Sequence, residues 1–213
     1  MSVRNASRAG KDGMARSKLK AVPVAEEPNR RAELLRVAAR LFREQGYDAT
    51  TIRDIAAAVG MRSGSPFYHF KSKQEMLKAV MLEGLQVAHA EMATVSARKL
   101  APRPAFLALV RAHLGTILEH GGDFIPVLLY EWRSLDAEAR AEIIRTKDAY
   151  EAVWQKAMRD LKKAGLIDGD PKLARLLIFG ALNWTAQWYR PDSGLSIDDI
   201  AKQATDFFLA QSK

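Results

Sequence analysis

Polar, cationic and aromatic side chains lie together between positions 53 and 73 of this chain of 213 residues. Guanidinium and ammonium groups bind anions, and hydroxyl and imidazole groups exchange hydrogen bonds with them. Small and polar residues come first in this segment and aromatic residues follow, a mixture suited to contacts with phosphate groups and base edges. The candidate residues are Arg53, Ser63, Gly64, Ser65, Pro66, Phe67, Tyr68, His69 and Lys73.

The sequence around these residues predicts two short helices joined by a tight turn. Thr51 is expected to cap the first helix, because Asp54 three residues later completes a capping box, and Gly60 is expected to end it. Ser63 is expected to cap the second helix, with Pro66 in its first turn, where a missing N–H costs little. A helix, a turn of about four residues and a second helix form a helix-turn-helix unit, whose second helix reads a DNA major groove.

The charge of the chain is concentrated in the same region. Residues 1–80 contain 16 Lys and Arg against 8 Asp and Glu, whereas residues 81–213 contain 17 of each. The whole formal net charge of +8 therefore lies within residues 1–80, which include the helix-turn-helix segment. Phosphate binding requires such a local excess, because cations on the protein displace condensed counterions. A basic terminus that only solubilises the chain is the alternative.

Composition excludes several other functions. The chain has no cysteine, which excludes disulfides, thiolate catalysis and cysteine-ligated zinc and is compatible with a reducing cytoplasm, the location that we expect. No apolar run approaches the ~20 residues of a membrane span, and the N-terminus lacks the apolar core of a secretory signal. We therefore expect no contact with a membrane.

Motifs for catalysis and metal binding are also missing. The sequence has no Gly-rich phosphate loop, nucleophile elbow or HExxH motif, so we expect neither an enzyme nor a cofactor. His113 and His120 lie seven residues apart on one predicted helix face, too far apart to hold one metal without distant ligands. No metal site is expected.

Hydrophobic periodicity predicts an all-α chain with three parts. Residues 1–28 are polar and small and are expected to be a disordered basic tail, which either follows a DNA backbone or is merely solvated. Residues 29–75 form the predicted three-helix DNA-binding domain, and residues 76–213 form the predicted ligand-binding and dimerisation domain. Beyond the helix-turn-helix, helices are expected over about 30–45, 72–100, 104–120, 124–133, 136–164 and 171–189 and from 196 onward.

The last two predicted helices carry more apolar surface than one face can hold. Residues 176–182 are apolar all round, so this helix must be buried on several sides, yet seven residues are too few to cross a bilayer. Pairing with a second copy is favoured over burial inside a monomer, because a helix-turn-helix protein reads two half-sites as a dimer. The candidate interface residues are Leu176, Gly180, Trp184, Gln187, Trp188, Phe207 and Phe208.

Residues 30–82 resemble the N-terminal domain of the TetR family of transcriptional repressors. They make up about a quarter of the chain, and the motifs are highly specific in combination. The resemblance implies an all-α homodimer that binds a palindromic operator and releases it when a small ligand binds. The matching residues are Ala39, Phe42, Gly46, Tyr47, Thr50, Thr51, Ile52, Ile55, Ala56, Gly60, Met61, Gly64, Ser65, Phe67, Tyr68, His69, Phe70, Lys71, Ser72 and Lys73.

The resemblance also implies roles for individual residues. Arg53 matches a position that contacts bases or phosphates, while residues 63–65 would meet base edges. Phe67 stands where the family often has a tyrosine, so it would contact a thymine methyl rather than donate to a phosphate. Tyr68, His69 and Lys73 would contact phosphates, and Pro66, in place of an aliphatic residue, would reshape the recognition helix.

By the same resemblance, a small-molecule pocket lies among the middle helices, and a largely apolar cavity with a few polar groups suits such a ligand. The stretch from Asn183 to Pro191 is similar to family members that respond to acyl-CoA thioesters. Ordinary core packing is the alternative for each predicted lining residue. These residues are Met92, Phe106, Val110, His113, Tyr130, Trp154 and Met158.

The predicted function is therefore that of a dimeric, ligand-responsive DNA-binding repressor. Its predicted partners are double-stranded DNA, a small-molecule effector and a second copy of the chain. An activator on the same fold is one alternative, because the sequence does not show where the protein binds relative to a promoter. An architectural protein that binds DNA without sequence preference is the other.

Overall fold

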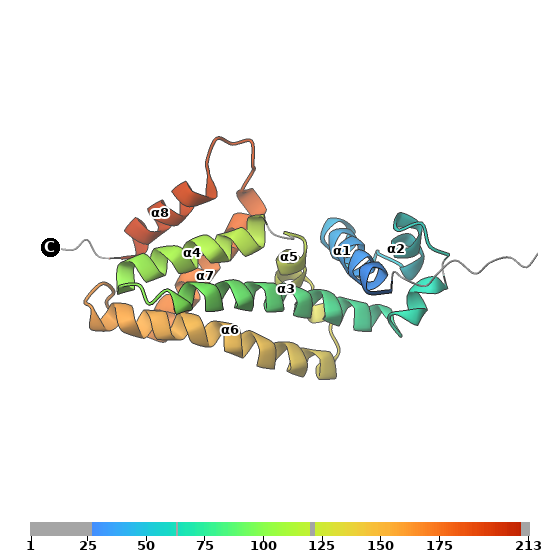
Figure 1. The fold of residues 1–213 in the computed structure, drawn as a ribbon, viewed down its shortest axis with the longest axis horizontal. Coiled ribbons are helices and arrows are strands. Elements are labelled where there is room, and N and C mark those ends of the chain that lie inside the picture. The colour runs from blue at the N-terminus through green and yellow to red at the C-terminus, as the bar shows by residue number, and fades with distance from the viewer. Residues whose placement is uncertain (1–26, 63, 120–121, 210–213) are drawn as a thin grey trace, which may run out of the picture.

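The computed structural model describes residues 27–62, 64–119 and 122–209, and every regular element in that part of the chain is a helix (Figure 1). The predicted all-α class is confirmed. Residues 1–26, which include nearly all of the predicted basic tail, lie outside the described residues. The elements are α1 (Glu27–Gln45), α2 (Ile52–Ala58), the 3-10 helix η1 (Ser65–Tyr68), α3 (Lys73–Ala97), α4 (Pro102–Leu118), α5 (Phe124–Tyr130), the 3-10 helix η2 (Trp132–Ser134), α6 (Ala137–Lys163), α7 (Pro171–Trp188) and α8 (Ile197–Phe208).

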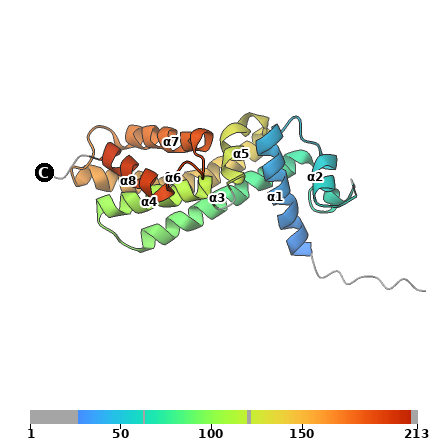
Figure 2. The ribbon, with the colours of Figure 1, turned by 90° about the horizontal axis from the view of Figure 1, so that it is seen from above.

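The helices form a small head at one end of an elongated body (Figure 1). α1, α2 and η1 make up the head, and the long helices α3 and α6 pack against each other along the body. Figure 2 shows α1 lying across α3, while α4, α7 and α8 cover the far part of the body. α3 is therefore the continuous connection between the two ends.

Side-chain caps start the helices where the sequence predicts. Thr51 accepts a hydrogen bond from the Asp54 N–H and donates its own N–H to that carboxylate, so the predicted capping box is confirmed. A second capping box joins Ser196 and Asp199 at the start of α8. Gly60 has φ +68°, a conformation open to glycine at little strain, and this lets the chain turn sharply after α2.

Two apolar cores divide the molecule, and they meet on α3. The first core contains residues of α1, α2 and the first half of α3 down to Leu85, together with Val127, Leu135 and Ile143. The second begins on α3 at Ala88 and takes in α4, α6, α7 and α8. The predicted domain boundary after residue 75 falls at the start of α3, whereas the cores divide about three turns further along the same helix.

One helix ends earlier than the sequence suggests. The predicted helix over 124–133 stops at Tyr130, and a 3-10 turn over Trp132–Ser134 follows. Glu131 has φ −97° and ψ 12°, outside the α region, and the Ser134 N–H then donates to the Glu131 carbonyl three residues back. This tightening leads the chain directly into Asp136, which caps α6.

Candidate DNA-binding surface and ligand cavity

The recognition element is one 3-10 turn, shorter than the helix predicted from residue 63. η1 begins at Ser65 after Gly64, which offers no side-chain cap. Pro66 occupies its first turn and has no N–H to extend a hydrogen-bonded helix backwards. Residue 63 and the side chain of Ser65 lie outside the described part of the structure, so the cap and the base contact predicted there remain predictions.

The recognition turn presents its aromatic side chains to solvent while its base is anchored. Tyr68 is 90% exposed and Phe67 53% exposed, an unusual state for large aromatic residues. Pro66 and Phe70 are buried beneath them, and the N–H groups of His69 and Phe70 both donate to the Pro66 carbonyl. Exposed aromatic side chains at the end of an elongated molecule are well placed to contact a large partner.

The DNA contacts of Arg53 and His69 stay predictions, and the ammonium of Lys73 is held by backbone carbonyls. Arg53 is exposed on α2, and His69 is partly exposed after η1. The Lys73 ammonium donates to the carbonyls of Tyr47 and Thr50, at 2.8 and 2.9 Å, and lies 4.0 Å from the centre of the Tyr47 ring. The Lys73 side chain thus fastens α3 to the loop after α1, and its contact with DNA phosphate stays a prediction.

A cavity of about 110 Å3 lies inside the body, between α3, α4, α5, α6 and α7. One side of it is apolar, and the other carries hydrogen-bonding and charged groups. Apolar surface with a few well-placed polar groups is typical of sites that bind small molecules. The lining residues are Leu85, Ala88, His113, Thr116, Ile125, Leu128, Leu129, Lys147, Tyr150, Glu151, Phe179 and Asn183.

His113 organises the polar side of this cavity. Its Nε2 lies 3.0 Å from the Asn183 Oδ1, an acceptor, so Nε2 carries the proton and Nδ1 accepts from the Tyr150 hydroxyl. The imidazole also stacks on the Phe179 ring with the ring centres 5.4 Å apart. Burial lowers the pKa of His113 from 6.5 to about 4, against a smaller opposing effect of the Asn183 hydrogen bond, and burial raises the pKa of Tyr150. Both groups are therefore neutral at physiological pH.

An ionic network borders the cavity. Glu151 accepts from Lys147 at 2.6 Å and lies 2.5 Å from a nitrogen of Arg175, which is 7% exposed and also donates to Gln155 at 3.1 Å. Two cations thus share one carboxylate beside the cavity, which leaves an excess of one positive charge. Buried charges need such partners, because an isolated ion pays a large desolvation penalty.

Most of the predicted pocket residues do not line this cavity. Among the seven, only His113 does. Five are fully buried in the second core, where they fill space between helices, and Tyr130 is 49% exposed on the outside of α5. The sequence could not separate lining from packing, because both need apolar residues on inward helix faces. The five core residues are Met92, Phe106, Val110, Trp154 and Met158.

The predicted interface residues form an open apolar face on α7 and α8. Trp184 is 61% exposed, Leu176 51%, Trp188 47% and Phe207 84%, while Phe208 is half-buried against the second core. Gly180 and Gln187 are exposed on the same helix. Within a single chain, Ile178 and Leu182 of α7 face inward and the opposite side is uncovered, so the predicted burial of this helix on several sides stays a prediction about the dimer.

Within residues 27–62, 64–119 and 122–209, no three His, Cys, Asp or Glu side chains come together to hold a metal ion. None of the helices formed by those residues is long and apolar enough to cross a membrane.

Comparison with known proteins places both halves of the chain in one family. Residues 34–80 match the model for bacterial regulatory proteins of the tetR family, and residues 100–212 match the tetracyclin repressor-like C-terminal domain. The chain is 31% identical to the HTH-type transcriptional repressor KstR2 of Rhodococcus jostii over 84% of its own length and 89% of that repressor.

Solved structures share this fold. A crystal structure of the superantigen PfiT is 41% identical and covers 85% of this chain and 97% of its own, with a TM-score of 0.72. AibR, in complex with isovaleryl coenzyme A and operator DNA, is 26% identical and covers 84% of this chain and 97% of its own, with a TM-score of 0.78. With both domain models matched and a repressor aligned along most of its length, the chain belongs to the TetR family.

Proposed function

We propose that the protein is a ligand-responsive transcriptional repressor that binds a palindromic operator as a homodimer. The observation that carries the proposal is the pairing of an exposed recognition turn at one end of α3 with a polar-lined cavity beside the same helix. A small, largely apolar effector in this cavity releases the operator. AibR, a structural relative, binds isovaleryl coenzyme A and operator DNA, which makes an acyl-CoA the first effector to test.

The apolar face of α7 and α8 supports the dimer. Exposed apolar patches of this kind mark association surfaces, because a monomer gains nothing from leaving tryptophans in water. Two copies of α7 and α8 would form a four-helix interface that covers Leu176, Trp184 and Phe207. The dimer would hold its two recognition turns one DNA turn apart, about 34–36 Å, which matches the half-site spacing of a palindrome.

Release follows from a shift between two dimer conformations. The effector must bind the conformation whose recognition turns no longer match the groove spacing more tightly than it binds the DNA-competent one. α3 is the element through which this difference reaches the head, because it contributes both to the cavity wall and to the first core.

Selection from a pool of random DNA duplexes at near-physiological salt tests the proposal. An enriched inverted repeat is expected, and isovaleryl-CoA or a longer acyl-CoA should then release it. Strong binding without enrichment would instead favour an architectural protein without sequence preference. The position of the recovered sites relative to promoters decides between repressor and activator.

Variants of the recognition turn locate the DNA contact. Tyr68→Ala should weaken binding to all sequences about tenfold, because it removes a hydrogen bond to a charged phosphate. Ser65→Ala should instead change the preferred sequence. Tyr130→Ala, which removes another exposed tyrosine far from η1, is the matched control and should bind DNA like the parent. If both recognition variants behave like that control, the assignment of η1 is wrong.

A further inference from the structure

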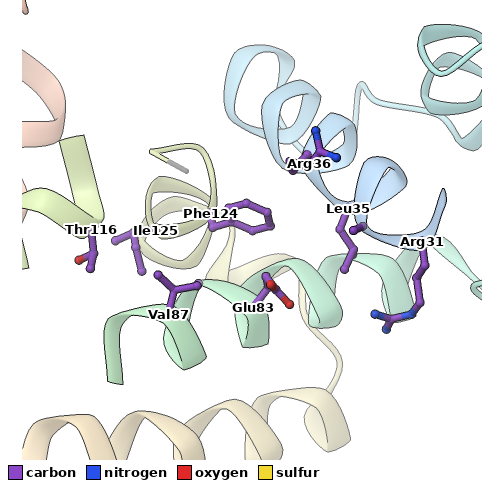
Figure 3. A pocket seen from close by; sticks show the side chains of 10 residues that line it. Arg31, Leu35, Arg36, Glu83, Val87, Thr116, Phe124 and Ile125 are labelled. Atoms are coloured by element: carbon purple, nitrogen blue, oxygen red, sulfur yellow. The ribbon is translucent and has the colours of Figure 1, made fainter. Parts of the chain in front are cut away.

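A second hollow lies directly beside the ligand cavity, between the head and the body. It has a volume of about 380 Å3 and is bounded by α1, α3, α4 and α5 (Figure 3). Its wall is mostly apolar, with two charged side chains on α1 and one on α3. The lining residues are Arg31, Ala32, Leu35, Arg36, Glu83, Gly84, Val87, Thr116, Phe124 and Ile125.

Two residues separate the hollow from the cavity. Thr116 and Ile125 line both spaces, so their side chains lie between the two. Thr116 is fixed by a hydrogen bond from its hydroxyl to the His113 carbonyl, whereas Ile125 is held only by apolar contacts. Figure 3 shows Ile125 and Val87 facing each other at this point. A rotation of the Ile125 side chain would therefore join the two spaces.

The size of the inner cavity makes such a connection necessary. A space of about 110 Å3 holds only a few non-hydrogen atoms, whereas sites for small-molecule ligands usually measure about 300–1,000 Å3. The two spaces together fall inside that range. An effector held through the His113 and Asn183 groups must extend past Ile125 if it is longer than a few atoms.

A glycine is what brings α3 and α5 close enough to shape the hollow. A Cβ atom at Gly84 would lie 2.9 Å from the Phe124 Cβ, closer than side chains approach each other. Because position 84 is glycine, Phe124 packs directly over α3 and points toward Leu35 of α1 (Figure 3). One wall of the hollow therefore belongs to the DNA-binding head.

The charges at the outer end favour an anion. Arg31 and Arg36 of α1 line the hollow together with one carboxylate, Glu83, which leaves one positive charge in excess. The Arg31 guanidinium also lies 4.9 Å from the centre of the Phe70 ring, directly after the recognition turn. An anionic group placed here would therefore act on a side chain that touches the base of η1.

We propose that the two spaces form one effector site, which takes an elongated, mainly apolar molecule with a hydrogen-bonding inner end and a negatively charged outer end against α1. This proposal rests on the proposed function and names the chemical class of its effector. The outer end of the molecule contacts the head directly, so binding there biases the position of α1 relative to α3.

Calorimetric titration with a series of ω-hydroxy carboxylic acids of four to twelve carbons tests the site. These acids carry both end groups and differ only in apolar length. In the parent protein, affinity should rise about fourfold per added methylene until both spaces are filled. Equal affinity for short and long acids, or no binding by any acid, would overturn the proposal.

A bulky side chain in the hollow should block the outer part of the site. Val87→Trp, at a position 37% exposed and outside the inner cavity, fills the hollow and should stop the gain in affinity at the short acids. Ala90→Trp places the same side chain at an exposed position of α3 away from the hollow and should leave the gain unchanged. Circular dichroism checks that both variants fold.

Arg36→Glu tests the charged end of the site. It should lower the affinity for the longest acids at least fivefold and leave the affinity for the shortest acids unchanged. Arg40→Glu, the same change one turn further along α1 and outside the hollow, should bind every acid like the parent. Parent-like binding by both Val87→Trp and Arg36→Glu would overturn the proposal, even where an enriched inverted repeat supports the repressor. If the random-duplex selection enriches no sequence but the acids still bind as expected, the proposed repressor function would be overturned and the effector site would not.

Discussion

The two cores of the molecule differ in the polar side chains that they bury. In the first core, the buried side chains are apolar except for Thr50, whose hydroxyl is satisfied by backbone carbonyls. The second core buries His113, Thr116, Arg175 and two more threonines among the described residues. Buried polar groups require partners, so a core that contains them is harder to build than an apolar one. The three threonine hydroxyls donate to carbonyls of their own helices, as Thr50 does to nearby carbonyls, so the difference between the cores lies in His113 and Arg175.

The head and the body also differ in the apolar side chains that they expose to solvent. The head exposes Phe67 and Tyr68 at the recognition turn, whereas α7 alone exposes Leu173, Leu176, Leu177, Trp184 and Trp188. An apolar face of this extent on one helix implies that another surface covers it. The head therefore exposes large apolar side chains only at its recognition turn among the described residues, whereas the body leaves an extended apolar face of α7 uncovered in the single chain.

The largest expected effect tests whether Phe106 belongs to the packing of the second core. Phe106→Ala should lower the free energy of unfolding by about 3–5 kcal/mol, because the side chain is fully buried and packs edge-on against Trp154. Urea unfolding followed by circular dichroism measures this loss. A variant that keeps its stability but binds effector differently would place Phe106 in the cavity wall after all.

The buried imidazole should make the stability of the body depend on pH. The pKa of His113 is about 4 in the folded protein and 6.5 when unfolded, so the unfolded chain binds more protons between these values. Stability is therefore full above pH 6.5 and falls by roughly 3 kcal/mol as the pH drops to 4. His113→Gln should flatten this dependence in thermal unfolding at pH 4.5–6.5, whereas exposed His89→Gln should not. Identical pH profiles for the two variants would contradict the neutral, buried state of His113.

The open face of α7 should be sensitive to charge. Trp184→Asp should weaken the dimer about 30-fold or more, because a central tryptophan of an interface often contributes about 2 kcal/mol. Analytical ultracentrifugation over a range of protein concentrations gives the dissociation constant. Lys172→Glu, an exposed change at the start of the same helix, should leave it unaltered. A parent protein that remains monomeric at all concentrations would remove the dimer from the proposal.

The smallest expected effect compares the helix caps of the head and of the body. Thr51→Ala in the head and Ser196→Ala in the body each remove the side chain of a complete capping box and should each lower stability by about 1 kcal/mol. Urea unfolding of the two variants measures both losses. A much larger loss at one site would show that its cap does more than start a helix.

Local sequence signals predicted much of the fold. Thr51, Ser72 and Ser196 cap helices where their spacing to an acidic residue indicates, because a cap involves only about four consecutive residues. The recognition turn was located correctly, but its length was not. Pro66 was expected to be tolerated in a longer helix, and the chain instead forms a single 3-10 turn around it.

The sites that depend on distant residues were predicted less well. Lys73 is basic and lies beside the recognition turn, so its sequence position suggests phosphate, but folding brings it onto two carbonyls more than 20 residues earlier. The polar partners of His113 lie 37 and 70 residues away along the chain. Tyr150, Lys147 and Arg175 carried no local signal, since an amphipathic helix pattern does not reveal which inward positions leave space between them.

The sequence by itself determined the helical class, the helix starts, the position of the DNA-binding turn and the apolar surplus of α7, because these features depend on neighbouring residues and their periodicity. Tertiary structure alone decided which apolar residues pack and which surround a cavity. It also decided that Gly84 brings α5 against α3 and that Ile125 separates two spaces. These features arise where helices distant in sequence meet, and a cavity depends on the sizes of all the side chains around it.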